Sequence, residues 1–179
     1  EVGPEALRFL DLLKVAGQRL WQVLPLGPTG YGDSPYQSLS SFAANVLTVS
    51  LEVLWQEGLL DRGDLAAFPR FSADVVHFEQ VIPLRMRLLR KAATTFLRDG
   101  STTDHAQFAA FERAEASWLD DFAAFVVAKD VHGGVAWTEW PAPLRERRPE
   151  ALAALVHEHA AAIAETKVLQ YFWSRQWSQ

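Results

Sequence analysis

The sequence predicts an α/β fold that is predominantly helical and only partly contained in these 179 residues. One segment, Leu20 to Leu26, has the pattern of a buried strand, whereas the stretches before and after it have helical periodicity. A single strand cannot form a stable sheet. We therefore expect this strand to pair with strands that the chain does not itself provide.

A helix is predicted before this strand. Pro4 is tolerated in a first helical turn, apolar residues recur at i, i+3, i+4 and i+7 from Ala6 to Leu13, and Gly17 is a typical helix stop. The run LWQVLPL that follows is short and apolar, which is typical of a buried strand, and Pro25 is expected to end this strand. The expected order is therefore helix and then strand.

Residues Gly27 to Ser41 (GPTGYGDSPYQSLSS) differ sharply from both neighbours. They are rich in Gly, Pro, Ser and Asp, the residues that form turns. Loops of this length without periodicity are uncommon in compact domains and are usually functional. We therefore expect the functional site here.

Helices are predicted for most of the remaining chain. A short extended segment is expected first, at Asn45 to Leu51. The predicted helices are Glu52 to Leu60, ending near Gly58; Pro83 to Arg98; a long helix beginning at Asp104, with an aromatic stripe of Phe111, Trp118, Phe122 and Phe125; and a last helix from Pro149 towards Trp177.

Composition and charge exclude several classes of function. The formal net charge of −5 is unlike the basic face that nucleic-acid binding requires. No apolar run approaches the roughly 20 residues of a membrane-spanning helix, and no leader pattern precedes the first helix. The absence of cysteine fits a reducing compartment, so a cytoplasmic location is expected, with neither nucleic acid nor membrane as a partner.

The usual catalytic motifs are also missing. The segment Gly27 to Gly32 lacks the Lys-Ser/Thr of a phosphate loop, and Ser34 lies in Gly-Asp-Ser-Pro rather than in G-x-S-x-G. His157 and His159 are two residues apart, which puts them on different helix faces and argues against a metal site. No metal and no cofactor are therefore expected.

Paired carboxylates, the groups that glycoside chemistry needs, occur only in predicted helices, where a solvated face is the simpler interpretation. These pairs are Asp120/Asp121 and Glu112/Glu115, and we expect no catalytic residue among them.

The seven tryptophans permit two interpretations, because indole rings serve both as core residues and as platforms for sugar rings. Trp118 is predicted to belong to the core with its aromatic stripe, and Trp173 and Trp177 to the core or a docking surface. Trp137 and Trp140, in a proline-bounded segment, fit either role.

The segment Trp21 to Asn45 (WQVLPLGPTGYGDSPYQSLSSFAAN) closely resembles a hallmark of the amylomaltase family, glycoside hydrolase family 77. The resemblance continues in order through Gly3 to Gln18, Ala116 to Glu146, which contains WTEWPAPLRER, and Phe172 to Trp177 (FWSRQW), so that it spans nearly the whole chain. One departure is Val46, where the family usually has proline.

This resemblance implies a fold. The family has a (β/α)8 TIM barrel with large helical insertions, so that the chain would hold about one or two barrel strands. Residues 1–45 would be a partial barrel with helix, strand and substrate loop, and residues 46–179 a helical insertion subdomain leading back to the barrel. The strand at Leu20 to Leu26 would be the second of the barrel.

The resemblance also implies an activity. The family is known as 4-alpha-glucanotransferase, and it transfers α-1,4-glucan segments between chains through a covalent glycosyl-enzyme intermediate. Its partners are maltooligosaccharides, starch and glycogen. The family's catalytic motifs IDHFRG and AEDLG do not occur here, so the chain alone is expected to be inactive. The alternatives are a non-catalytic glucan-binding or scaffold remnant, and an independently folded helical domain without a sugar role.

Five loop residues match family positions. Tyr36 matches a Tyr that stacks on sugar near the cleavage point, and Ser34 and Gln37 beside it offer hydrogen bonds to hydroxyls. Asp33 has a family counterpart, although an Asx-turn would explain it equally well. Tyr31 matches a Tyr that belongs to an additional glucan site in some members.

Overall fold

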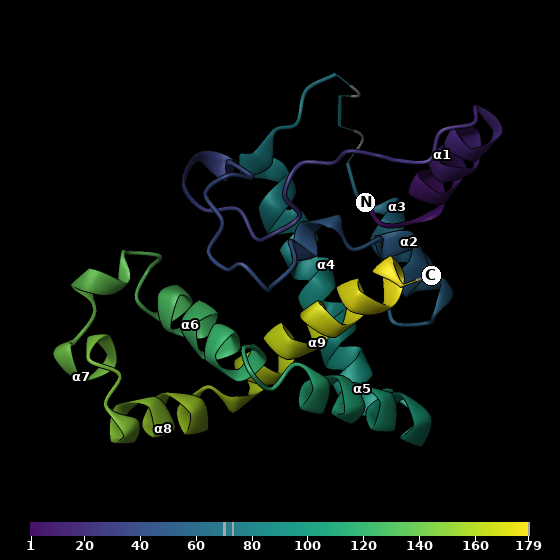
Figure 1. Ribbon diagram of the computed structural model, residues 1–179. Coiled ribbons are helices and arrows are strands. Elements are labelled where there is room, and N and C mark those ends of the chain that lie inside the picture. The colour runs from purple at the N-terminus through teal and green to yellow at the C-terminus, as the bar shows by residue number, and fades with distance from the viewer. Residues whose placement is uncertain (70, 73, 179) are drawn as a thin grey trace. The chain divides into compact units, whose positions relative to one another are not determined.

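The computed structural model describes residues 1–69, 71–72 and 74–178, without the side chain of Tyr31. Within these residues the chain is helical and contains no β-strand (Figure 1). The α-helices are α1 (Pro4–Val15), α2 (Leu51–Gln56), α3 (Arg62–Ala66), α4 (Phe78–Asp99), α5 (Thr102–Ala114), α6 (Leu119–Val131), α7 (Ala142–Arg145), α8 (Pro149–Glu158) and α9 (Ala160–Trp177). Three 3₁₀ helices complete the fold: η1 (Tyr31–Asp33), η2 (Val46–Thr48) and η3 (Trp137–Glu139).

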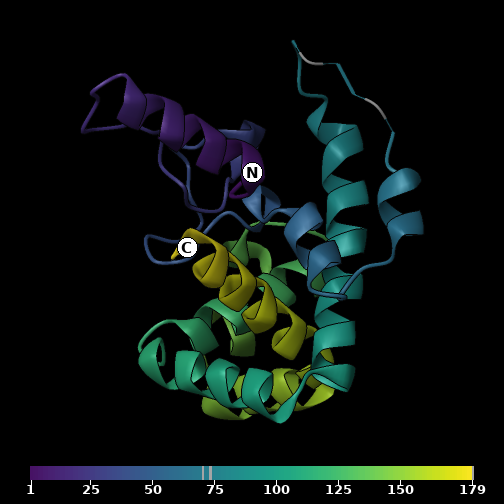
Figure 2. The ribbon, with the colours of Figure 1, turned by 90° about the vertical axis from the view of Figure 1, so that its right-hand side faces the viewer.

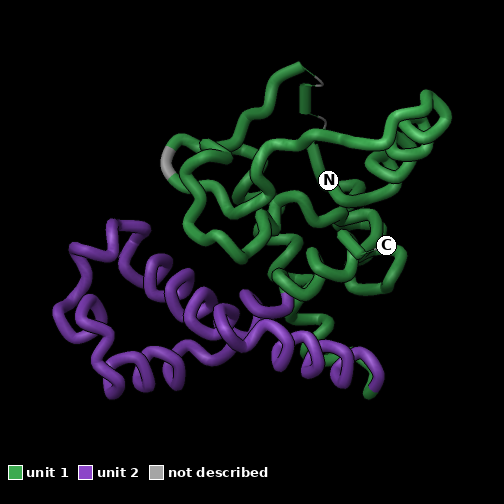
Figure 3. Tube along the Cα trace, in the orientation of Figure 1, with its two compact units in different colours: residues 1–102, 169–179 green, residues 103–168 purple. Residues whose placement is uncertain are grey.

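Two compact units divide the chain (Figure 3). Unit 1 contains residues 1–102 and 169–179, and unit 2 contains residues 103–168. The helix α9 contributes to both, since its last nine residues belong to unit 1.

The first predicted helix is confirmed, but the predicted strand is not. Helix α1 begins at Pro4, as expected. Residues Leu20 to Leu26 form no strand in the described part of the chain, and Leu20 is 91% exposed. A strand needs a neighbouring strand for its main-chain hydrogen bonds, and within the described residues this segment has one such bond to a distant residue, from the Asn45 N–H to the Leu26 carbonyl at its end. The helical part of the predicted fold class is therefore confirmed, whereas the described residues do not contain the predicted strand.

Helix α1 and the segment after it form an apolar surface. No residue of α1 is buried, although its sequence has the stripe of a core helix. The exposed side chains are Leu7, Phe9, Leu10, Leu12, Val15, Leu20, Trp21, Val23 and Leu24. Phe9 and Trp21 contact each other edge to face, with ring centroids 5.1 Å apart. A surface of this composition is typical of an interface with further polypeptide.

The core of unit 1 lies between α2, α4 and the end of α9. Figure 2 shows α2 and α3 lying along the long helix α4. Phe96 of α4 packs edge to face on Phe172 of α9 at 5.5 Å, and both rings are almost fully buried. Leu54 and Leu89 have no exposed surface. Helix α4 begins five residues before the predicted start, so that Pro83 lies inside it.

Three other expectations need correction. The long helix expected from Asp104 is two helices, because residues 115–118 form turns between α5 and α6. The helix from Pro149 breaks at His159, which leaves helical backbone geometry at φ −113° and ψ 27°. The segment Asn45 to Leu51 is not extended: the Asn45 side chain accepts the N–H of Leu47 at 3.0 Å and begins η2.

Unit 2 has its own core, in which α6 contacts α8. Ala123 and Val127 of α6 pack with Ile163, and Ala128 packs with Trp140 and Leu155. Helix α6 ends in a Schellman motif, because Gly133 donates to the carbonyl of Asp130 and Gly134 to that of Lys129, at 3.1 and 2.8 Å. Both glycines have positive φ. This stop sends the chain back towards the helix through the tryptophan-proline segment.

A pH effect is predicted at the contact between α3 and α4. The Lys91 ammonium donates to the Asp64 carboxylate at 2.7 Å and the Asp61 N–H donates to it at 2.8 Å, so that the pKa of Asp64 lies below its ordinary value. This contribution to stability is present above the unfolded pKa of about 3.9 and is lost as pH falls through the lower folded pKa. Lys91→Met should raise the pKa of Asp64 in an NMR titration of its carboxyl carbon; an unchanged pKa would contradict this assignment.

Candidate functional site: the loop cavity

The loop at residues 27–41 is folded and closed at its base. Thr29 and Ser38 form an isolated antiparallel bridge, and the Leu39 N–H donates to the Pro28 carbonyl at 3.1 Å. Just outside the loop, the Asn45 N–H donates to the Leu26 carbonyl at 2.7 Å. The two ends of the loop are therefore held side by side, and its middle projects from them.

Local sequence chemistry shapes the middle of the loop. A Cβ on Gly30 would lie 2.5 Å from the Gln37 carbonyl oxygen, so only glycine allows the two sides to approach this closely. The Ser34 hydroxyl oxygen accepts the N–H of Tyr36 at 3.3 Å. The Ser40 hydroxyl oxygen accepts the N–H groups of Phe42 and Ala43, both at 3.1 Å. These are the side-chain-to-backbone bonds expected of a serine-rich turn region.

A cavity of about 480 Å³ lies against this loop. Three aromatic residues line it, Tyr36, Phe42 and Trp173, together with loop serines and residues Pro25 to Gly27. Tyr36 is 74% exposed, and its hydroxyl makes no hydrogen bond within the described chain. Among the described residues, no charged side chain lines the cavity. It can therefore bind a neutral ligand that has apolar faces and hydroxyl groups, but it holds no group for acid-base catalysis.

Trp173 reaches the loop cavity from α9 and is held on two sides. Its indole Nε1 donates to the Thr48 hydroxyl oxygen at 2.9 Å, and that hydroxyl donates to the Asn45 carbonyl at 2.7 Å. Its ring stacks on Trp177, with centroids 5.1 Å apart and planes 12° apart. The indole is therefore a fixed wall of the loop cavity.

Two glutamines of α9 fix the chain that leaves the loop. Gln170 accepts the Ala44 N–H at 2.8 Å and donates to the Ala44 carbonyl at 3.1 Å. Gln176 makes the same pair of bonds with Ser50, at 2.7 and 3.2 Å. Both glutamines are buried. Along one face of α9, Gln170, Trp173 and Gln176 follow one another at intervals of three residues.

Of the residues predicted from the loop sequence, only Tyr36 lines the cavity within the described chain. Ser34 is half-buried and shapes the turn around Tyr36, and Gln37 is exposed beside it. Asp33 ends η1 with φ 54°, a left-handed conformation that Asp tolerates better than most residues. The side chain of Tyr31 lies outside the part of the chain that the structure describes.

Sequence reasoning missed Phe42 and Trp173 as cavity residues. Trp173 was expected in the core or a docking surface, yet it contributes a wall opposite the loop. A signal was present: Gln170 and Gln176 lie three residues before and three residues after Trp173 in the last helix. Buried polar side chains at this spacing indicate specific main-chain partners.

The helical carboxylates and Trp118, considered above as candidate residues, make contacts with other side chains that account for them structurally. Lys167 forms ion pairs with Glu112, at 3.1 Å, and with Asp120. Burial lowers the pKa of Lys167, but these hydrogen bonds outweigh it and raise the pKa above its ordinary value. Trp118 donates its Nε1 to Glu115 at 2.6 Å and is half-buried.

The described residues form neither a metal centre nor a membrane span. Among them, no three His, Asp or Glu side chains gather where they could hold a metal ion. No described helix combines the length and apolarity needed to span a bilayer.

Comparison with known proteins identifies the family. A family model described as 4-alpha-glucanotransferase matches residues 1–179. The chain is 42% identical to the 4-alpha-glucanotransferase of Thermus thermophilus over 176 residues, which are 98% of this chain and 34% of that protein. It is 32% identical to the chloroplastic/amyloplastic enzyme of Solanum tuberosum over 184 residues, covering 100% of this chain and 32% of the relative.

A solved structure agrees. The amylomaltase from Streptococcus agalactiae, determined in complex with acarbose, matches with a TM-score of 0.90 and 34% identity, over 98% of this chain and 35% of that one. The relatives are glycosyl-transferring enzymes by name. The chain belongs to the 4-alpha-glucanotransferase family, glycoside hydrolase family 77, and spans about a third of the length of these relatives.

Proposed function

We propose that this chain is the part of a 4-alpha-glucanotransferase that holds a glucan against the loop cavity. The whole enzyme transfers α-1,4-glucan segments between maltodextrins by a retaining double displacement. Its substrates are maltooligosaccharides, starch and glycogen, and it acts in the cytoplasm without nucleic acid or membrane. The nucleophile and the acid/base carboxylic acid come from polypeptide outside residues 1–179.

One observation carries this proposal: three aromatic residues and a serine-rich segment line the loop cavity, and no charged side chain of the described residues does so. A pyranose ring has apolar C–H faces and a neutral hydroxyl edge, so that such a lining suits it. Tyr36 presents its ring and an unbonded hydroxyl to the same space. A sugar can therefore stack on the ring and accept or donate a hydrogen bond at the hydroxyl.

The remaining loop residues take supporting roles in this proposal. Ser34 and Gln37 contribute hydrogen bonds to sugar hydroxyls, and Ser34 also fixes the turn on which Tyr36 stands. Asp33 holds the left-handed end of η1. Tyr31 contributes to an additional glucan contact.

The exposed apolar surface supports the domain division of the proposal. We infer that residues 1–45 are part of a (β/α)8 barrel and that 46–179 are its helical insertion. Segment 20–26 would then become a strand once flanking strands supply its main-chain partners. The nine large exposed apolar side chains of α1 and segment 20–24 would be covered by the rest of that barrel.

The test is transfer activity on maltotriose, measured for this chain and for the full-length protein that contains it. The full-length protein should yield glucose and longer maltodextrins, because it supplies the two carboxyl groups that retention requires. The 179-residue chain should yield no product above a buffer control. An inactive full-length protein that still binds maltodextrins would instead indicate a glucan-binding remnant.

A further inference from the structure

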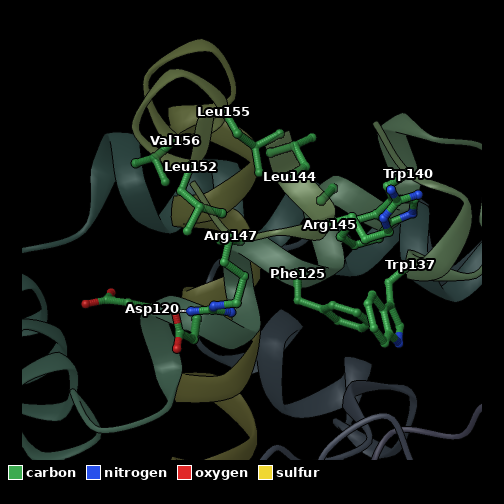
Figure 4. A pocket seen from close by; sticks show the side chains of 13 residues that line it. Asp120, Phe125, Trp137, Trp140, Leu144, Arg145, Arg147, Leu152, Leu155 and Val156 are labelled. Atoms are coloured by element: carbon green, nitrogen blue, oxygen red, sulfur yellow. Dashed lines mark hydrogen bonds and ion pairs between the residues drawn. The ribbon is translucent and has the colours of Figure 1, made fainter. Parts of the chain in front are cut away.

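A second cavity, of about 480 Å³, lies within unit 2. It is formed by α6, by the segment through η3 and α7, and by α8, and it shares no residue with the loop cavity (Figure 4). Its volume falls in the range of about 300–1,000 Å³ that is typical of small-molecule sites. We call it the unit 2 cavity.

One side of the unit 2 cavity is aromatic. Phe125 and Trp140 lie with ring centroids 5.5 Å apart, and Trp140 is buried. Trp137 stands beside them and is 53% exposed, unlike the buried Trp140. Figure 4 shows Phe125 and Trp137 facing the aliphatic side chains of α7 and α8 across the cavity.

Trp140 adds a polar feature to this wall. Its enclosed indole Nε1 has no hydrogen-bond partner among the described residues. Buried donors are almost always satisfied by protein or by an ordered molecule. This nitrogen has almost no accessible surface, so it is enclosed in the wall and is not itself a contact for a ligand in the cavity.

The rim of the unit 2 cavity carries balanced charge. Two aspartates and two arginines line it, so the formal charges cancel. Arg147 and Asp121 form an ion pair at 2.8 Å, and Arg145 donates to the Thr138 carbonyl at 3.3 Å. Arg147 stands in a left-handed conformation at φ 54° with its guanidinium towards the cavity (Figure 4). An anion or a cation would meet charge of its own sign here, whereas a neutral ligand with many hydroxyls meets both donors and acceptors.

We propose that the unit 2 cavity is a second binding site for an α-linked glucose oligomer, independent of the loop cavity. The face of a pyranose ring stacks on the Trp137 indole. The guanidinium and carboxylate groups of the rim form hydrogen bonds with the hydroxyl groups of the sugar. The choice of glucose oligomer rests on the proposed function, whereas the cavity, its neutral rim and its exposed indole do not. A site of this kind would give the protein a glucan contact in addition to the one proposed at the loop cavity.

The test follows Trp137 directly, by ¹⁹F NMR of the full-length protein labelled with 5-fluorotryptophan. The Trp137 signal is assigned by its loss in Trp137→Phe. The probe is a thio-linked maltotetraose, which is not cleaved during the titration, and thio-linked cellotetraose is the β-linked control. We expect the Trp137 signal to shift saturably with the α-linked probe only, and to do so also in Tyr36→Ala, in which the loop cavity is impaired.

Affinity gives a second measurement. In the Tyr36→Ala background, Trp137→Ala should weaken calorimetric binding of the α-linked probe by about tenfold, because the remaining binding then depends on the unit 2 cavity. Trp55→Ala is the matched control, since Trp55 is an exposed indole outside both cavities and its loss should leave affinity unchanged. Trp137 is more than half exposed, so these variants should fold.

Three outcomes overturn the proposal. A Trp137 signal that stays fixed while the Trp173 signal saturates leaves only the loop cavity as a glucan site. An equal shift with the β-linked probe removes the assigned ligand class. A shift that follows protein concentration alone assigns the unit 2 cavity to a second copy of the chain. Each of these is compatible with normal transfer activity on maltotriose, so failure here is distinguishable from failure of the proposed function.

Discussion

Gln170→Leu should lower the free energy of unfolding by about 2–6 kcal/mol, because leucine leaves both main-chain groups of Ala44 without a partner. Ala44 is buried, so water does not replace the lost bonds. Each unsatisfied buried donor or acceptor costs about 1–3 kcal/mol. Urea unfolding of the full-length protein, followed by far-UV circular dichroism, measures the difference.

The matched control is Gln56→Leu. Gln56 lies on the exposed face of α2, and its amide bonds only to Glu52 at 3.3 Å. Surface substitutions of this kind usually change stability by less than about 0.5 kcal/mol. If Gln170→Leu lowered the free energy of unfolding no more than Gln56→Leu does, the hydrogen bonds between Gln170 and Ala44 would not hold the chain that leaves the loop. Transfer activity should fall with Gln170→Leu even at temperatures where the protein remains folded, because Ala44 lines the loop cavity.

The helices were predictable to the extent that their signals are local. Pro4 begins α1 and Pro149 begins α8, as the sequence indicates, since proline fits a first helical turn. The breaks were not predictable from periodicity, because apolar residues recur at helical spacing on both sides of residues 115–118 and of His159. The expected strand failed for another reason. Segment 20–26 has strand composition, but strand formation depends on a neighbour that a local pattern cannot provide.

The loop cavity was half predictable, for a similar reason. Its loop side follows from turn residues and from Tyr36, all within 15 residues of sequence. Its other side is Trp173, held by a bond to Thr48, which lies 125 residues away along the chain. Contacts between residues so far apart in sequence arise from tertiary packing. The sequence around residue 173 therefore does not indicate that Thr48 is its partner. The two glutamines beside it mark a polar helix face, but not the main chain that this face holds.

Tyr36→Ala should reduce kcat/KM for maltodextrin transfer by about 10- to 100-fold in the full-length protein. Tyr36 is 74% exposed at the loop cavity, so that its ring is available to a sugar and contributes little to the core. Stacking on the ring contributes roughly 0.5–1.5 kcal/mol and the hydroxyl about 1 kcal/mol more. At about 1.4 kcal/mol for each factor of ten, the sum gives the stated range.

Tyr36→Phe keeps the ring and should lose only the smaller part of kcat/KM, whereas Trp55→Ala, an exposed ring outside both cavities, should leave kcat/KM unchanged. Steady-state kinetics on maltotriose measures all three variants, and the melting temperature of Tyr36→Ala should stay within a few degrees of wild type, since its side chain has few neighbours to lose. Intact kinetics combined with a large loss of stability would make Tyr36 a structural residue of the loop and remove it from the proposed glucan site.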